Sequence, residues 1–423
     1  MMSAYRSNSP RAQYFSGLIL LLLLLPMIAF AGQKKTAPAP EVKPADQRIK
    51  AYFDISKIVW PGPPAIARIR FMDIYTGEKV DPDLFNKKKE EKKQKWMDRL
   101  AGTKPLADQY DLSKLPFQLI RTYGVAVDSK GNIYAGDQGV GAVFIFNPET
   151  KGVELIKNRK DANFGLINGL AIDDSDRLFV TDSKLREVLV FNPQHQQEGA
   201  FGGDVLANPG GLAIDNENRF LYVVDTGNDV VDVFDADTFK LLRKIGTPGK
   251  RHTLTDPGTF SLPSNVAVDN DGNVYVVDSF NARIEIFDAD GGFISMFGKL
   301  SDAPGFFERP KGIAIDSDGH IWVVDAAQDR VKVFDRDGQL LIYFGEHGAY
   351  PGQFQGLYGI TIDNKNNRVV TSENWPGRVQ VFRYVTDAEF EKATKEKEQA
   401  GTRVTAEQKK SEQPAPAQSS AAH

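Results

Sequence analysis

The chain repeats one short pattern of apolar and polar positions six times. In each copy a small residue precedes an apolar residue, Ala or Thr, a second apolar residue and Asp. The copies occupy residues 124–128, 169–173, 211–215, 265–269, 312–316 and 359–363, so that successive copies lie 42 to 54 residues apart. This period is typical of stacked repeats or propeller blades. A single unit cannot bury its own apolar faces, so we expect the six units to share a core.

Each repeat contains four short apolar segments separated by turn residues. In the fourth repeat these segments are 266–268, 274–277, 283–287 and 293–297. The second segment is apolar at successive positions, which predicts a strand covered on both faces by neighbouring blades. The third and fourth segments alternate, which places them nearer the rim. The pattern predicts an all-β fold, a six-bladed β-propeller of four-stranded antiparallel blades.

The sixth repeat has no fourth strand of its own. After 378–382 the sequence turns into a polar segment, whereas residues 67–77 match 339–345 in their alternation and final Gly. We therefore predict that an N-terminal strand completes the last blade, which would leave no open edge between the two ends of the ring.

The flanking segments differ in composition from the repeats. Arg6 and Arg11 precede an apolar run at 18–28 that ends in small residues, as in an export signal, and an uncleaved membrane anchor is the alternative. Thr386 and Glu389 form a T-x-x-E capping box that predicts a helix. We expect a signal peptide at 1–31, a flexible linker at 32–65, the closing strand at 66–78, a charged helical insertion at 79–116, the propeller at 117–385, a polar helix at 386–400 and a disordered tail at 401–423.

Composition and charge narrow the possible partners. The chain has no Cys, so it forms no disulfide, and its formal charge of -4 makes a nucleic-acid partner unfavourable. We expect an extracytoplasmic monomer, periplasmic or secreted, that contacts a membrane only if the N-terminal segment remains attached.

The repeats resemble the NHL repeat. The fourth copy carries the resemblance through 262–269, 272–279, Asn281, 283–284, Phe287 and 297–298. The resemblance implies a six-bladed propeller of the exported bacterial type, a group whose members serve as binding platforms, sensor ectodomains or lyases. The first and sixth copies depart most: Gly139 and Gly141 replace a polar loop, and Ser372 stands where the second strand is expected to end in Asp.

Several residue patterns could support chemistry, but each also has a structural explanation. The turns 269–272 and 316–319 resemble the start of a calcium loop yet lack its later ligands, so we favour hairpin turns. The Asp residues that end the second strands are expected to bond loop backbone. The five His residues are not placed to converge, and no nucleophile motif is present. We expect no catalytic residue, metal or cofactor.

Two sets of residues are candidates for binding. The residues just before each innermost strand should ring the channel mouth: Tyr123, Asn168, Gly210, Ser264, Lys311 and Tyr358. The loops between second and third strands share that face and offer Leu185, Arg186, Phe280 and Trp375. Exposed apolar anchors with nearby cations are typical of protein-recognition surfaces. The alternative is that Phe280 and Trp375 pack back on adjacent blades.

These observations favour an extracytoplasmic, non-enzymatic platform that recognises another protein through this face. One alternative is a small-molecule enzyme, lyase or lactonase-like, that uses the channel. Another is a cell-wall glycan binder, in which the same Tyr and Trp residues would stack on sugars.

Overall fold

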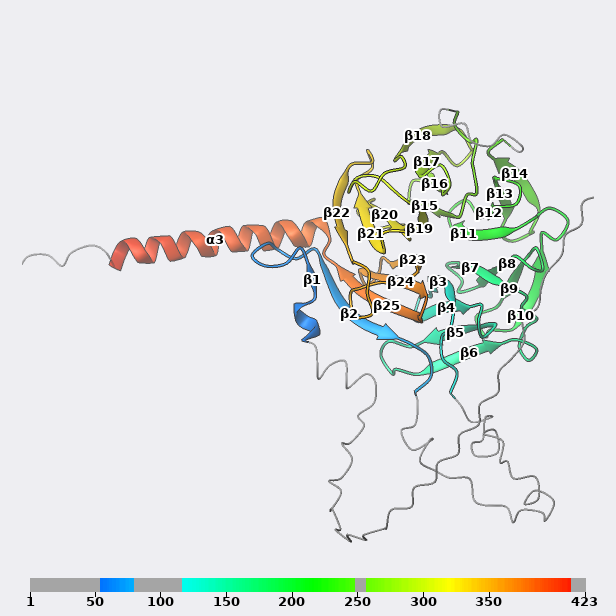
Figure 1. Ribbon diagram of the computed structural model, residues 1–423, viewed down its shortest axis with the longest axis horizontal. Helices are drawn as coiled ribbons and strands as arrows, with labels where there is room; N and C mark the ends of the chain where they lie inside the picture. Colours follow the sequence, from blue (N-terminus) through cyan, green and yellow to red (C-terminus); the bar gives the residue numbers. More distant parts are fainter. Residues whose placement is uncertain (1–53, 80–115, 248–255, 412–423) are drawn as a thin grey trace, which may run out of the picture. The chain divides into compact units, whose positions relative to one another are not determined.

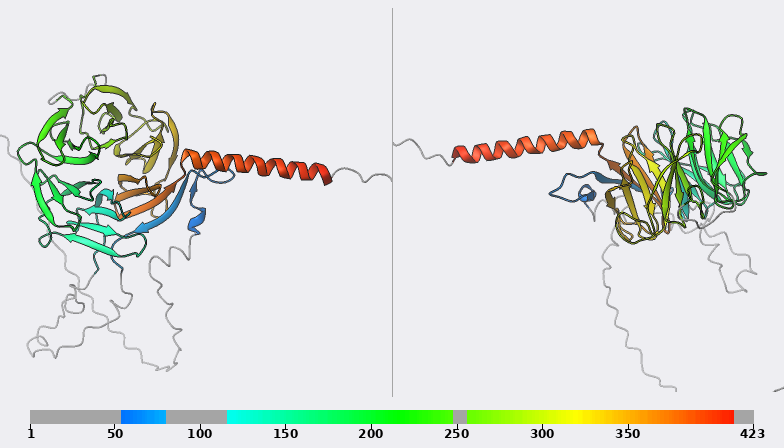
Figure 2. Two further views of the ribbon diagram at one scale, coloured as in Figure 1. Left: turned by 180° about the vertical axis from the view of Figure 1, so that it is seen from behind. Right: turned by 90° about the horizontal axis from the view of Figure 1, so that it is seen from above.

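A computed structural model describes residues 54–79, 116–247 and 256–411, with side chains to 399. Six antiparallel sheets surround one axis in chain order (Figure 1), and Figure 2 shows the same ring from behind and from above. The predicted six-bladed propeller is therefore confirmed. The expected signal peptide, the helical insertion at 80–115, His252 and the last part of the tail lie outside the described residues.

The first three blades follow one another without interruption. Blade 1 contains β3 (Thr122–Val127), β4 (Ile133–Asp137), β5 (Ala142–Phe146) and β6 (Val153–Lys157). Blade 2 contains β7 (Ile167–Ile172), β8 (Leu178–Asp182), β9 (Glu187–Phe191) and β10 (Gln197–Phe201). Blade 3 contains β11 (Pro209–Asp215), β12 (Phe220–Asp225), β13 (Val230–Asp235) and β14 (Leu241–Ile245).

The last three blades return the chain to the first. Blade 4 contains β15 (Asn265–Val268), β16 (Val274–Asp278), β17 (Arg283–Phe287) and β18 (Phe293–Phe297). Blade 5 contains β19 (Pro310–Ile315), β20 (Ile321–Asp325), β21 (Arg330–Phe334) and β22 (Leu340–Phe344). Blade 6 contains β23 (Leu357–Asp363), β24 (Arg368–Asn374), β25 (Gly377–Tyr384) and two N-terminal strands, β2 (Ile69–Tyr75) and β1 (Val59–Trp60).

The innermost strands explain why each repeat begins with a small residue. Each inner strand contacts the next, and β23 contacts β3, so the ring is closed. At Gly169 a Cβ would lie 2.8 Å from the Gly210 carbonyl oxygen, and at Gly359 it would lie 2.4 Å from that of Tyr123. A side chain at these positions would push neighbouring blades apart, because packed interiors leave no spare volume.

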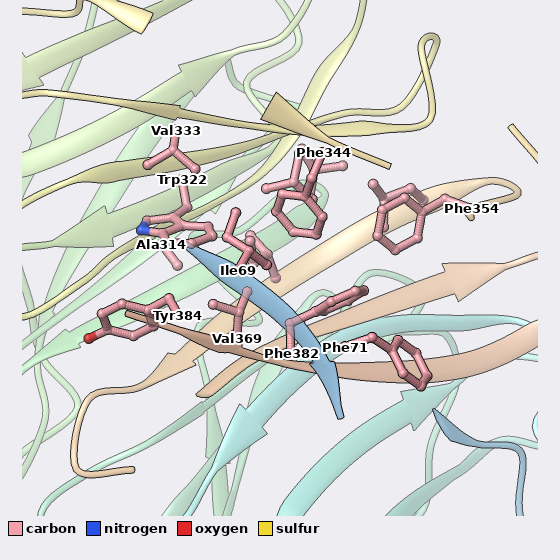
Figure 3. Close-up of a cluster of buried hydrophobic side chains, with 14 residues drawn as sticks. Ile69, Phe71, Ala314, Trp322, Val333, Phe344, Phe354, Val369, Phe382 and Tyr384 are labelled. Atoms are coloured by element: carbon pink, nitrogen blue, oxygen red, sulfur yellow. The ribbon is translucent and has the colours of Figure 1, made fainter. Parts of the chain in front are cut away.

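The predicted closure of the last blade is confirmed. Strand β2 pairs antiparallel with β25, with Ile69 opposite Tyr384 and Phe71 opposite Phe382. Ile69 and Phe71 belong to the apolar cluster between blades 5 and 6 (Figure 3). Closure by an N-terminal strand ties both ends of the described ring into one sheet.

A fifth strand extends this blade beyond the expectation. Residues 32–65 were assigned to a flexible linker, yet β1 pairs with β2, and η1 (Ile55–Lys57) precedes it. The Trp60 ring lies 5.3 Å from that of Phe344 and 5.9 Å from that of Phe382. Partial burial of this large aromatic side chain holds the segment against the cluster between blades 5 and 6.

The third strands lie nearer the rim than the second strands, as predicted, but they are buried. All five residues of β17 are buried, including the charged Arg283 and Glu285. The alternation of their sequence reflects ion pairing: Arg283 Nε lies 2.9 Å from Asp278 Oδ2, and Arg283 Nη2 lies 2.7 Å from Glu285 Oε1. The fourth strands β10, β14 and β18 are largely exposed.

A helix follows the propeller. The helix α3 (Asp387–Ser411) begins with the predicted capping box, in which Glu389 N donates to Thr386 Oγ1 (3.3 Å) and Thr386 N donates to Glu389 Oε2 (3.2 Å). It continues eleven residues beyond the expected end at 400. Arg68 fixes its first turn through Asp387 (2.5 Å) and Phe390, whose ring centroid lies 4.4 Å from the guanidinium carbon. Within the described ranges, none of the helices combines the length and apolar character needed to cross a bilayer.

Candidate functional site

The two ends of the ring carry different connections. In each antiparallel blade the inner strand begins, the second strand ends and the third strand begins at the same end of the ring. We call this end, with the loops between second and third strands and the loops that enter each inner strand, the loop face. The opposite end carries the short hairpins between first and second strands, and we call it the turn face.

The Asp residues at the ends of the second strands organise the loop face. Asp225 accepts hydrogen bonds from Ala207 N (2.8 Å) and Asn208 N (2.9 Å) in the loop that enters its blade. Asp182 does the same for Gly165 N and Leu166 N. The other members are Asp137, Asp278 and Asp325. These buried carboxylates hold loop backbone, as expected, so they are not free for acid–base chemistry.

In blade 6 the equivalent acid is Glu373, which corrects the expectation that Ser372 replaces it. Glu373 stands opposite Arg378 in the sheet, as Asp278 stands opposite Arg283 in blade 4. It accepts a bond from Gln355 N (2.7 Å) and pairs with Arg378 Nη2 (2.7 Å). The acid follows the Asp of the inner-strand motif by ten residues in blade 6 (363 to 373) and by nine in blade 4 (269 to 278), so the longer hairpin hides the match in the sequence.

A channel of about 610 Å³ runs along the axis and is lined by all six inner strands. Tyr123, Asn168 and Tyr358 from the predicted mouth ring line it. The sheet register shifts at the ring position in five inner strands, those of blades 1, 2, 3, 5 and 6. Such bulges re-aim side chains, which explains how residues at the edge of a sheet reach the axis.

The two tyrosines lie side by side at the loop-face end of the channel. Their ring centroids are 4.5 Å apart with an interplanar angle of 66°. Burial, together with the nearby Tyr123, raises the pKa of the Tyr358 hydroxyl to about 12. Tyr358 therefore remains protonated near neutral pH and can donate a hydrogen bond, but it is not a base there.

Asn168 and Ser264 serve the structure of the ring. Asn168 Nδ2 donates to Pro209 O (2.9 Å), and its Oδ1 accepts from Gln138 Nε2 (2.8 Å), so its amide links three blades. Ser264 is buried and donates through Oγ to the Lys311 carbonyl oxygen (2.9 Å). The polar atoms of both side chains therefore already form hydrogen bonds within the ring.

Lys311 differs from the other members of the ring. It is partly buried, and burial, reinforced by the positive charge of Arg309, lowers the pKa of its ammonium group. Among the described residues no carboxylate forms an ion pair with it. Lys311 and Ser264 lie outside the set of channel-lining residues, so they are placed at the rim rather than on the wall.

The turn-face end of the channel is acidic. Its lining includes Asp215, Glu217, Asp269 and Asp271. Asp269 Oδ1 accepts from Asp271 N and Asn273 N at 2.9 Å each, as a hairpin residue does. These contacts agree with the interpretation as turns rather than calcium loops.

A group of Asp316, Asp318 and His320 offers ligand atoms within 4.8 Å of one another. The Asp316 carboxylate is already engaged, since Oδ2 lies 2.9 Å from His320 Nδ1 and accepts from Trp322 Nε1 (2.8 Å). Its Oδ1 accepts two backbone N–H groups of the same turn. The group is thus a hydrogen-bonded hairpin that also contacts α3 through Asp387.

The described histidines do not gather at one site. His195 Nε2 lies 2.9 Å from Tyr134 Oη, and His347 Nδ1 lies 2.7 Å from Asp329 Oδ2. None of the histidines in the described part of the chain lines the channel. The described channel therefore presents no set of His ligands of the kind that catalytic zinc uses.

The predicted apolar loop residues are exposed. Leu185, Phe280 and Trp375 have 37%, 63% and 73% of their surface accessible, and Arg186 beside Leu185 is also exposed. The alternative, in which Phe280 and Trp375 pack back on adjacent blades, does not account for these fractions. Exposed aromatic side chains of this size on loops indicate a contact surface.

The same face also carries exposed apolar residues that the sequence does not predict there. Ile120, Leu166 and Leu262 lie in loops that enter inner strands and are exposed. Each lies near one of the predicted residues: Phe280 N donates to Ser261 O beside Leu262 (3.1 Å), and a Cβ on Gly165, beside Leu166, would lie 3.3 Å from Leu185 Cγ. A Cβ on Gly377 would lie 2.5 Å from Ile120 N, which places Ile120 beside the Trp375 loop. The sequence gives no signal that separates an apolar residue in this place from the start of the strand that follows it.

Comparisons with known proteins support the fold. A family described as the SMP-30/gluconolactonase/LRE-like region matches residues 258–343. A probable peptidyl-α-hydroxyglycine α-amidating lyase of Caenorhabditis elegans is 33% identical over 106 residues, which are 24% of this chain and 29% of that protein. The match thus spans under a third of the length of this curated relative.

Comparison with solved structures found similarities at low sequence identity. A protein of unknown function from Bacteroides thetaiotaomicron has a TM-score of 0.51 and 18% identity, over 63% of this chain and 70% of that chain. Virginiamycin B lyase from Staphylococcus aureus has a TM-score of 0.47 and 12% identity, over 63% and 95%. The chain is a six-bladed β-propeller in which residues 258–343, in blades 4 and 5, match the family model of the SMP-30/gluconolactonase/LRE-like region.

Proposed function

We propose that this protein is a non-enzymatic binding platform that captures another protein through the loop face of its propeller. The observation that carries the proposal is the set of exposed apolar side chains on the loops of one face, which includes Ile120, Leu166, Leu185, Leu262, Phe280 and Trp375. Exposed apolar side chains on loops mark interaction sites, because a bound partner removes their surface from water.

The charges of the loop face support a protein partner. Arg121, Lys184, Arg186 and Arg309 are exposed there, and none of them has an ion-pair partner among the residues that the structure describes. Apolar anchors surrounded by cations resemble the arrangement of an interface with a polar rim. Such a rim favours a partner whose own surface is acidic.

We further propose that the protein works outside the cytoplasm. The support is the charged start, apolar run and small-residue exit of residues 1–31, together with the absence of Cys. With the partner bound at the loop face, the turn face and its hairpin carboxylates point away from the partner.

A second candidate function is a lyase or lactonase-like enzyme that uses the channel. The similarity to the amidating lyase and to the gluconolactonase-like region favours it. The described lining offers no His, and its carboxylates lie at the turn face, where they hold hairpins. Thermal unfolding with Zn²⁺, Ca²⁺ and a panel of lactones separates the two, because a ligand that binds only the folded state raises the unfolding temperature.

Site-specific photocrosslinking tests the platform. A photoreactive amino acid is introduced in producing cells at Phe280 or Trp375, and as a matched control at Ile294 or Leu341, which are exposed on the outer strands β18 and β22. We expect a discrete crosslinked product of stoichiometric yield from the two loop-face positions and none from the controls. Equal products at all four positions, or none at the loop face, would contradict the proposal.

A further inference from the structure

Lys311 is the one ring residue whose charge is not balanced within the described structure. It stands in the bulge of β19, one residue before the strand approaches β23 most closely, where a Cβ on Gly312 would lie 2.7 Å from Tyr358 O. Its own carbonyl is fixed by Ser264 on the other side. The backbone of Lys311 is therefore held between two blades, which restricts where its ammonium group can reach.

Other cations in the protein show what burial normally requires. Three are fully buried among the described residues, and each pairs with the acid that ends a second strand: Lys332 with Asp325 at 3.0 Å, Arg283 with Asp278 at 2.9 Å, and Arg378 with Glu373 at 2.7 Å. Lys311 has no such acid, and the charge that acts on it is that of Arg309, which is also positive. A partly buried ammonium group beside a second cation is unfavourable unless an anion joins them.

The two ends of the channel carry opposite charges. The turn-face end is lined by carboxylates, whereas Lys311 and Arg309 lie at the loop-face end. An anion is repelled from the first and attracted to the second, and the attraction is strengthened by the low dielectric of the mouth. Tyr123 and Tyr358 line the channel at this same end, where the protonated hydroxyl of Tyr358 is a hydrogen-bond donor.

We infer that the loop-face mouth of the channel is a carboxylate site in which Lys311 supplies the ion pair and Arg309 the second positive charge. One ammonium group and one guanidinium suit a single negative charge, whereas phosphate sites rely on clustered backbone N–H groups or several cations. The inference rests on the proposed function for its source of ligand, because a partner docked over the loop face would present an acidic side chain or its chain end. A free small carboxylate has the same chemistry.

The test measures the reactivity of Lys311 with sulfosuccinimidyl acetate, followed by peptide mass spectrometry of the whole protein. Only the neutral amine reacts, so an ion pair that raises the pKa by about one unit slows acetylation about tenfold. The probes are sodium acetate and N-acetyl-trialanine with a free carboxylate. The matched neutral probe is the C-terminal amide of the same peptide, at equal ionic strength.

We expect the peptide carboxylate to slow acetylation of Lys311 about tenfold, the amide to have no effect, and Lys184, an exposed lysine on the same face, to react at an unchanged rate. The peptide carboxylate should also raise the unfolding temperature of wild-type protein and of Lys311→Arg, but not of Lys311→Met. A stronger effect of the peptide than of acetate points to a partner's carboxylate, whereas equal effects point to a free one. No protection by either carboxylate would overturn the inference. Crosslinking at Phe280 would be unaffected, so the two proposals fail separately.

Discussion

Replacing one side chain of the closing strand should weaken the whole ring. Phe71 in β2 is 6% exposed, and its ring lies 5.6 Å from that of Phe382 in an edge-to-face arrangement. A buried Phe removes roughly 150–200 Å² of apolar surface from water, which at about 25 cal/mol per Å² corresponds to about 4–5 kcal/mol. Alanine retains part of this surface but leaves a cavity, so we expect Phe71→Ala to lower the free energy of unfolding by about 3–5 kcal/mol.

The neighbouring residue supplies the control. Met72 is 43% exposed on the same strand, so Met72→Ala should cost about 0.5 kcal/mol or less. Guanidinium-induced unfolding followed by far-UV circular dichroism and by tryptophan fluorescence measures both variants. If β2 closes the ring, both probes should shift together in Phe71→Ala, because Trp322 belongs to the same cluster as Phe71. Equal midpoints for the two variants, or a shift confined to one probe, would refute the reasoning.

Two further predictions concern the inner ring and the junction with α3. Gly359→Ala should lower the free energy of unfolding by about 1–3 kcal/mol, because the new Cβ would lie 2.4 Å from Tyr123 O. Gly199→Ala is the control: a Cβ there would have no atom within 4 Å, so the substitution should be nearly neutral. Thermal unfolding of the two variants measures the difference, and equal unfolding temperatures would contradict the prediction. The hydrogen bond to Asp316 raises the pKa of His320, so the stabilisation from protonated His320 should be complete below about pH 6.5 and should decline as the pH rises through the raised pKa. The unfolding temperatures of the wild type and of His320→Gln should therefore converge at alkaline pH. A difference that stays constant with pH would contradict this prediction.

The sequence predicted those residues of the candidate site that lie on loops, outside any core position. Phe280 and Trp375 were recognised because they stand on loops between strands, where no core position exists, and the structure leaves both exposed. Ile120, Leu166 and Leu262 were missed because an apolar residue just before an inner strand is indistinguishable, in sequence, from the start of that strand. Only the paired register shows that it lies outside the sheet.

The sequence by itself determined the number of blades, their strand order and the N-terminal closure. The number of blades follows from six copies of one motif, the strands from the apolar segments within each copy, and the closure from the strand that the sixth copy lacks, all of which can be read directly from the sequence. The tertiary structure decided which polar residues are buried, because burial depends on the neighbouring blade. It placed Arg283 and Glu285 in the interior, gave Glu373 the role of the missing Asp, and left Lys311 without an acid. The buried ion pairs join neighbouring strands of one blade, but the adjacent blades determine whether these pairs are buried, so their burial appears only once the ring is closed.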